Sequence, residues 1–115
     1  MSLDTLKLNA YRGRNRIVLV FAPSPASNAY LTQKQLLGNV EDGLRERDLL
    51  VFYLSGEDAN KLRKRFDIPE TAFALVLIGK DGGEKKRFTE PTQPAVLFDV
   101  IDQMPMRRRE MKKGQ

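Results

Sequence analysis

Three uninterrupted apolar runs constrain the fold of this chain more than any other feature. They span residues 17–21, 49–54 and 72–78 and read IVLVF, LLVFYL and AFALVLI. A short apolar run without polar alternation is typical of a strand that is buried on both faces. Because the first two runs are each followed by a segment long enough for a helix, the sequence predicts an α/β fold.

The first predicted helix covers residues 30–47. Apolar side chains recur there on one stripe at helical spacing, as in a helix that packs on a sheet. Gly38 and Gly43 lie inside this segment, and each weakens a helix by about 1 kcal/mol relative to Ala. The stripe consists of Tyr30, Leu37, Val40 and Leu44.

Two further helices are predicted along the chain. One begins at Ser55, a favoured N-cap residue, and ends before Pro69. The other begins at Pro94, which suits a first helical turn, and is interrupted at Pro105. Asp99 and Asp102 lie opposite the apolar face of this last helix, so we expect both carboxylates to be solvated.

The Asp-Gly pair at Asp81 predicts a tight turn and an antiparallel hairpin into residues 85–89, a polar segment suited to a sheet edge. The helices after the first two strands predict right-handed crossovers with parallel pairing. The resulting β-α-β-α-β-β-α order predicts a thioredoxin-like, three-layer α/β/α fold around a four-stranded mixed sheet.

A resemblance goes beyond this order of elements. The segments RNRIVLVFAPS, RDLLVFYLSGED, LRKRFDIP, LVLIGKDGGEKKRF and IDQMPMRRREM resemble a bacterial thioredoxin-like domain family of unknown function, related to the DUDES domains of sushi-repeat matrix proteins. The resemblance covers nearly the whole chain, and DQMPMRRREM is its most specific part. It implies a fold shared with peroxiredoxins and suggests antioxidant or adhesion roles, but no defined reaction.

The chain contains no Cys and no His. Thiolate chemistry is therefore excluded, and the usual ligands of zinc, copper and haem are missing. In thioredoxins the redox motif lies after the first strand, where a helix N-terminus lowers the pKa of a cysteine. Here residues 23–28 read PSPASN. We expect no enzymatic activity, no catalytic residue, no cofactor and no metal.

The loop 23–28 is nevertheless one candidate binding surface, through Pro23, Ser24, Ser27 and Asn28. Open α/β sheets tend to bind ligands at the carboxyl ends of their strands, and free N–H groups at a helix start can hold an anion. The alternative is an ordinary loop with Ser or Asn capping the helix. Thioredoxins also place a cis-proline directly before the third strand, but Glu70 and Thr71 separate Pro69 from that run, so we do not expect Pro69 to have this role.

The second candidate surface is basic and C-terminal, with Arg107, Arg108 and Arg109. Residues 104–115 carry +4 of the net charge of +5. Three alternatives remain open: contact with an anionic partner, solvated charge, and fold-back onto the domain's own carboxylates. A second basic cluster comprises Lys7, Arg12, Arg14 and Arg16.

Together these features favour a non-catalytic interaction module in residues 1–105, followed by a basic tail or short helical extension in residues 106–115. The partner would be an unknown protein or an anionic molecule, and a homodimer is compatible with the pattern. One alternative is a redox protein that acts through a partner or cofactor. Another is weak nucleic-acid or anion binding, although nucleic acid is disfavoured because interleaved stacking aromatics are missing.

The location predicted for the chain as written is cytoplasmic. No stretch approaches the length of a membrane span, and the N-terminus lacks an apolar signal core. If a native leader was removed, the location predicted is outside the cell.

Overall fold

The computed structural model describes the backbone of residues 5–113 and the side chains of residues 8–56 and 59–113. The elements are α1 (Thr5–Ala10), β1 (Arg16–Ala22), α2 (Asn28–Gly38), α3 (Glu41–Glu46), β2 (Leu49–Ser55), η1 (Gly56–Ala59), α4 (Asn60–Phe66), β3 (Ala74–Ile78), β4 (Glu84–Phe88), α5 (Pro94–Asp102) and α6 (Pro105–Lys113).

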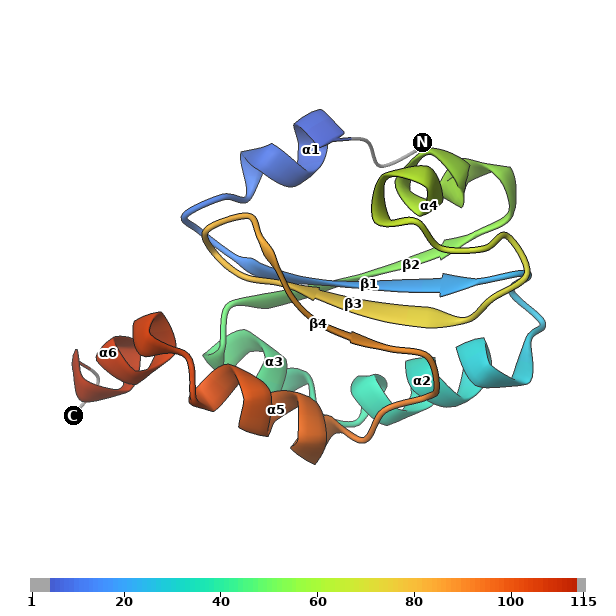
Figure 1. Cartoon of the computed structure of the whole chain (residues 1–115). Helices are drawn as coiled ribbons and strands as arrows, with labels where there is room; N and C mark the ends of the chain where they lie inside the picture. Colours follow the sequence, from blue (N-terminus) through green and yellow to red (C-terminus); the bar gives the residue numbers. More distant parts are fainter. Residues whose placement is uncertain (1–4, 114–115) are drawn as a thin grey trace.

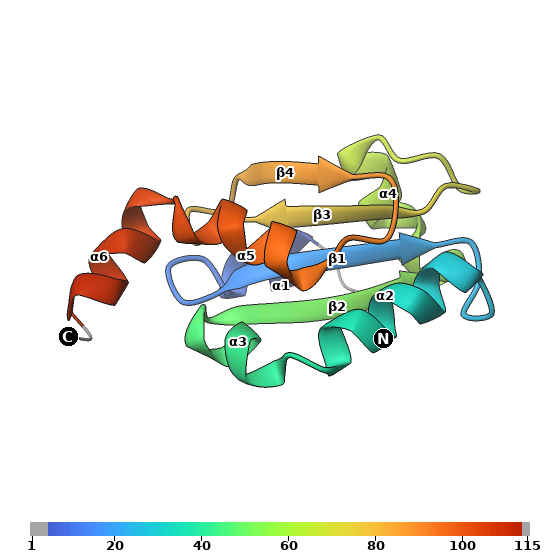
Figure 2. The same cartoon turned by 90° about the horizontal axis from the view of Figure 1, so that it is seen from below.

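The four strands form one mixed sheet in the order β2-β1-β3-β4. Strands β1 and β2 are parallel, and β3 runs antiparallel to both β1 and β4. Helices α1 and α4 cover one face, whereas α2, α3 and α5 cover the other (Figures 1 and 2). The predicted three-layer thioredoxin-like architecture is confirmed.

The predicted parallel pairing of the third strand is wrong. Phe21 of β1 lies opposite Ala74, so β3 starts at the sheet end where β1 finishes. The seven residues of α4 span roughly 10 Å, whereas the seven residues of β2 span roughly 23 Å. Helix α4 spans less than half the length of β2, and the chain re-enters the sheet at the end where β2 finishes, so β3 runs in the opposite direction.

Strand β1 forms the centre of the molecule, and all seven of its residues are buried. Ile17, Leu19 and Phe21 face the core beneath α1 and α4. Val18 and Val20 face the second core, under α2 and α5. One continuous apolar run therefore contributes to both cores, as expected for a strand covered on both sides.

The long helix predicted over residues 30–47 is two helices, α2 and α3, separated at Asn39 and Val40. The break lets α3 approach α5 closely. A methyl group on Gly43 would lie 2.7 Å from Cε2 of Phe98. The glycine that weakens the helical pattern is thus the residue that allows α3 and α5 to pack together.

Other boundaries differ in smaller ways. Ser55 ends β2 rather than capping a helix, because η1 intervenes before α4. Helix α1 was not predicted at all. The antiparallel hairpin, the edge strand β4, the helix start at Pro94 and the interruption at Pro105 are confirmed. Of the two alternatives for the residues after Pro105, a tail or a helical extension, the structure shows a helix, α6.

Among the described residues, none of the helices has the length and apolar character needed to cross a membrane.

We expect Gly43→Ala to destabilise the fold by about 1 kcal/mol. Overpacking against Phe98 costs roughly 1–3 kcal/mol, and the gain in helix propensity offsets only part of it. Gly38→Ala is the matched control, because nothing lies within 4 Å of a methyl group there. Urea titration should show a loss for the first variant and no loss for the second. Equal effects would contradict the close packing of α3 on α5.

Candidate functional site

The loop between β1 and α2 lies at the predicted place, at the carboxyl ends of β1 and β2. The side chains of Pro23, Ser24 and Asn28 are exposed, and Ser27 is half-buried. Ser24 Oγ accepts a hydrogen bond from the Ala26 N–H at 3.1 Å. Ser27 is the N-cap residue of α2 but makes no capping hydrogen bond with its side chain, so the alternative in which Ser27 caps the helix is not supported.

The peptide bond before Pro69 is trans, as are all other peptide bonds among the described residues, so Pro69 does not occupy the cis-proline position of thioredoxins. Its carbonyl accepts a hydrogen bond from Arg63 Nη1 at 2.5 Å, and the same nitrogen donates to the Ala72 carbonyl at 3.1 Å. The segment before β3 is thus fixed by a buried guanidinium from α4.

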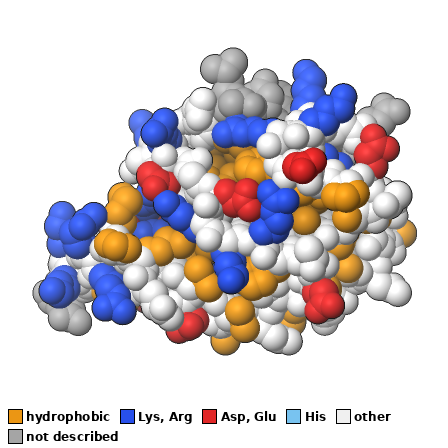
Figure 3. Space-filling model, in the orientation of Figure 1, with side chains coloured by type: hydrophobic (Ala, Val, Ile, Leu, Met, Phe, Trp, Pro, Cys, Tyr) orange, Lys and Arg blue, Asp and Glu red, His pale blue; other side chains and the backbone are white. Residues whose placement is uncertain are grey.

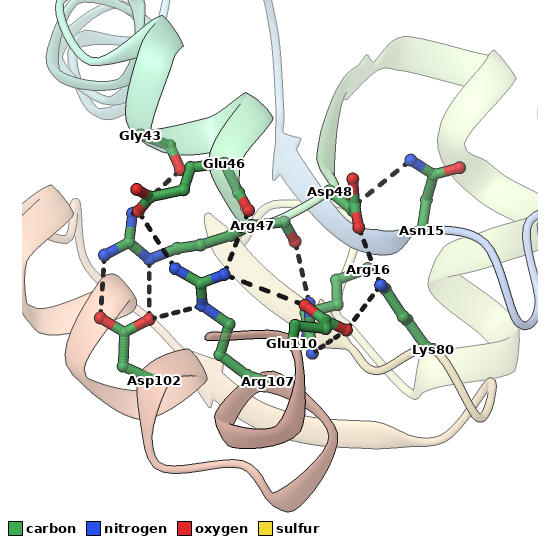
Figure 4. Close-up of polar contacts among 10 residues, drawn as sticks. All are labelled: Asn15, Arg16, Gly43, Glu46, Arg47, Asp48, Lys80, Asp102, Arg107 and Glu110. Carbon is green, nitrogen blue, oxygen red and sulfur yellow. Dashed lines mark hydrogen bonds and ion pairs between the residues drawn. The ribbon is translucent and has the colours of Figure 1, made fainter. Parts of the chain in front are cut away.

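A larger polar cluster lies at the opposite end of the sheet, where β1 and β2 begin (Figure 4). It links α3, the starts of β1 and β2, the turn after β3, and helices α5 and α6. We call it the charge network. Its members are Arg16, Glu46, Arg47, Asp48, Lys80, Asp102, Arg107 and Glu110.

Arg16 is the innermost member, with an exposed fraction of 1%. Its Nη1 and Nη2 atoms donate to the two carboxylate oxygens of Glu110 at 3.1 and 3.2 Å. Nη1 also donates to the Arg47 carbonyl at 2.9 Å. A planar guanidinium suits such a two-pronged contact, which ties the first residue of β1 to α6.

Lys80 is the second cation on Glu110. Its Nζ lies 2.7 Å from Glu110 Oε2 and 2.8 Å from Asp48 Oδ2. The hairpin turn, the start of β2 and α6 therefore meet at one ammonium group.

Arg107 joins α6 to α5 and α3. Its Nε donates to Asp102 at 3.0 Å, and its two terminal nitrogens donate to the carboxylate and the carbonyl of Glu46 at 3.1 and 3.2 Å. Asp102 also accepts two hydrogen bonds from Arg47, at 3.0 and 2.8 Å. The Arg47 guanidinium in turn stacks 4.0 Å from the centre of the Phe98 ring.

The network shifts the pKa values of its members in a consistent direction. Burial opposes ionisation of Glu110, but hydrogen bonds from Arg16 and Lys80 outweigh it and lower the pKa of that carboxyl. Burial likewise opposes ionisation of Asp102, and hydrogen bonds from Arg47 and Arg107 lower its pKa. Burial also opposes the charged form of Lys80, yet its carboxylate partners raise its pKa. All three groups are therefore held in their charged forms.

The structure separates the predicted basic residues. Arg107 has an exposed fraction of 5% and its donors are occupied within its own domain, so the fold-back alternative holds for this residue. Arg108 and Arg109 are exposed on the same helix. In the other cluster, Arg12 and Arg14 are exposed, but Arg16 is buried. Lys7 lies outside the described side chains.

The expectation that Asp102 is solvated is wrong. Its carboxylate has an exposed fraction of 32% and receives two arginines, because α3 and α6 both approach the outer side of α5. Asp99 is exposed as expected and accepts a hydrogen bond from Gln103. Periodicity identifies the face of a helix that meets the sheet, but not a second contact on its other side.

Beside the network lies a hollow of about 310 Å³. Met104, Pro105 and Met106 form an apolar wall, and Arg16, Lys80 and Lys85 supply the cations. Each of these cations is already paired with a carboxylate of the domain. Among the described side chains, no three acidic residues cluster in a way that could hold a metal ion.

The fold and this site together define a thioredoxin-like domain whose redox position carries serines and prolines. The particular family follows from a sequence comparison: a model named Domain of unknown function (DUF4174) matches residues 7–110. The chain belongs to this family.

The chain is also similar to parts of longer vertebrate proteins. It is 28% identical over 120 residues to the human sushi repeat-containing protein SRPX, a match that covers 90% of this chain and 26% of that protein. It is 27% identical over 133 residues to coiled-coil domain-containing protein 80 of Danio rerio, covering 90% of this chain and 15% of that protein. The chain therefore spans about a quarter or less of these relatives.

Solved structures show the same fold at low sequence identity. A reduced 2-Cys peroxiredoxin of Plasmodium vivax superposes with a TM-score of 0.74 at 14% identity, covering 89% of this chain and 84% of that one. A Thermus thermophilus thioredoxin superposes with a TM-score of 0.61 at 18% identity, covering 90% of this chain and 87% of that one. These likenesses establish the thioredoxin-like fold.

We expect Glu110→Gln to destabilise the domain by about 2–3 kcal/mol at neutral pH. Removing one partner of a fully buried ion pair costs roughly 3–5 kcal/mol, and Glu110 keeps an exposed fraction of 27%. Glu84→Gln is the matched control. It breaks an exposed pair with Arg87 and should cost no more than about 1 kcal/mol.

The pH dependence of the stability difference between wild type and Glu110→Gln provides a second readout. A carboxyl with a lowered pKa contributes stability above its unfolded value of roughly 4.3, and that stability is lost as the pH falls through the folded value. Denaturant titrations at pH 7 and pH 3 should therefore show a smaller difference between wild type and Glu110→Gln at pH 3. A difference that is constant with pH would contradict the ionic origin of the effect.

Proposed function

We propose that this domain is a non-catalytic binding module that recognises an acidic protein partner through the exposed face of α6. The observation that supports this proposal is that the three consecutive arginines of α6 differ in their environment. Arg107 is held by Asp102 and Glu46, whereas Arg108 and Arg109 are exposed. A fixed helix presents its exposed guanidinium groups without the entropy cost that a disordered tail would have on binding.

Other cations gather at the same end of the molecule. Lys112 and Lys113 are exposed in the last turn of α6. Arg12 and Arg14 are exposed in the loop before β1, and β1 starts where Arg16 meets α6. Figure 3 shows Lys and Arg side chains crowding the surface at the α6 end of the molecule. A surface of this kind attracts negatively charged partners and accelerates their association.

The redox position supports the non-catalytic part of the proposal. The loop 23–28 offers hydroxyl groups but no thiol, and a serine next to a helix start stays protonated without a neighbouring base. Pro23, Ser24, Ser27 and Asn28 form a second candidate contact, at the opposite end of the sheet from α6. Two contact surfaces at opposite ends suit a module that connects two partners, and the similar segments of SRPX and coiled-coil domain-containing protein 80 are parts of longer proteins.

Binding to poly-L-glutamate tests the proposal. We expect the double variant Arg108→Ala/Arg109→Ala to bind at least about tenfold more weakly than wild type in low salt, because two exposed cations are lost. Lys61→Ala/Lys64→Ala on α4 is the matched control. It removes the same net charge from the other side of the sheet and should change binding much less.

Two results would contradict the proposal. Equal weakening by both double variants would mean that net charge alone, and not the α6 surface, attracts the acidic polymer. Peroxide or disulfide reduction by the purified domain above the uncatalysed rate would overturn the non-catalytic reading and favour the redox alternative.

A further inference from the structure

The two edges of the sheet differ in chemistry. Strand β4 forms one edge, and its residues Glu84, Lys85, Lys86 and Arg87 are all exposed. Charged side chains on an edge strand, lysines above all, prevent pairing with another chain. Strand β2 forms the other edge and reads LLVFYLS, without a single charge over seven residues. Only one of the two edges is protected by its own sequence.

The side chains of β2 are less covered than those of the central strand. All of β1 is buried, whereas Leu50, Val51, Phe52 and Tyr53 of β2 are only half-buried. An uncharged, partly exposed edge strand of this length is a template for another strand. Figure 2 shows β2 at the rim of the sheet, with α2 crossing its second half and α3 lying on the outer side of its first half.

The backbone of β2 has a defined set of groups that point outward. The Asp48 carbonyl accepts a hydrogen bond from the Arg16 N–H, so residue 48 faces β1. Backbone groups alternate between the two sides of a strand. Leu49, Val51, Tyr53 and Ser55 therefore turn their N–H groups away from the sheet.

We propose that a second copy of this chain pairs with β2 along this edge, antiparallel, with a two-fold axis at Phe52. In this register Val51 faces Tyr53 of the other copy, and Leu49 faces Ser55. The inner pairs join residues whose backbone groups all point outward, so each can exchange two hydrogen bonds. A shift of the axis by half a residue would place outward-facing residues opposite inward-facing ones.

The helices beside the edge carry charges that suit the same symmetry. A hollow of about 270 Å³ opens between β2 and the pair α2 and α3. Lys34 of α2 lines it next to the Tyr53 ring, at 5.6 Å from the ring centre, and Glu41 of α3 lines it as well. Both side chains are exposed. Because the axis brings the α2 side of one copy against the α3 side of the other, Lys34 meets the Glu41 of the second copy, and the contact occurs twice.

The homodimer uses β2, Lys34 of α2 and Glu41 of α3, and it does not involve the α6 surface. Sedimentation velocity from micromolar to millimolar protein should show a monomer–dimer equilibrium. Lys34→Glu and Glu41→Lys should each weaken the dimer by about tenfold or more, because like charges then meet twice. The double variant Lys34→Glu/Glu41→Lys should restore wild-type affinity. Lys86→Glu on the β4 edge is the control and should leave the equilibrium unchanged.

Val51→Pro provides a backbone test. It removes an outward N–H while the pairing of β2 with β1 keeps its hydrogen bonds, so the fold should persist and the dimer should be lost. If Val51→Pro unfolds, the single and double variants at Lys34 and Glu41 test the proposed dimer by themselves. A wild-type protein that stays monomeric at millimolar concentration overturns the proposal. So does a dimer that a folded Val51→Pro variant retains, or one that the double charge exchange fails to restore.

Discussion

The ion pair between Arg16 and Glu110 is the interaction on which the C-terminal part of the structure depends. A guanidinium with an exposed fraction of 1% is strongly unfavourable without a carboxylate partner. Arg16 is the first residue of the central strand, so its position is set by the sheet. Among the described residues, Glu110 is its only carboxylate partner, and α6 must therefore dock where the sheet holds this charge.

The rest of the network extends this constraint to the neighbouring elements. Lys80 connects the hairpin turn to Glu110, and Arg107 connects α6 to α5 and α3. Arg47, Lys80 and Arg107 each lie between two carboxylates, and Asp102 and Glu110 each accept hydrogen bonds from two cations. Such a network specifies one arrangement of elements, because any other would leave a buried charge unpaired.

The elements that are local in sequence could be predicted, and the contacts between distant ones could not. The apolar runs, the Asp-Gly turn and Pro94 identify the strands, the hairpin and the start of α5, and Pro105 identifies the place where this helix is interrupted. The direction of β3 depends on where the chain returns to the sheet after α4, and the close approach of α3 to α5 depends on the space that Gly43 leaves for Phe98. The spacing of apolar residues along the sequence gives no information about either of these contacts between distant elements.

The candidate site shows the same limit. The sequence identifies Arg107, Arg108 and Arg109 as one basic run, but only the structure separates the buried member from the exposed pair. Arg16 belongs to a basic cluster in the sequence and to the core in the structure. One feature of the sequence indicates that Arg16 is buried. It directly precedes an apolar strand that is covered on both faces, so neighbouring elements cover its side chain as well.

Amide hydrogen exchange along α6 tests the central claim most directly. A nine-residue helix is unstable in water by itself, so protection of α6 must come from its contacts with the domain. We expect slow exchange in α6 of the wild-type protein and at least about tenfold faster exchange in Arg107→Gln, with β1 and β3 unchanged. Exchange of α6 in the wild-type protein at the rate of an unstructured chain would contradict the claim that the charge network fixes this helix.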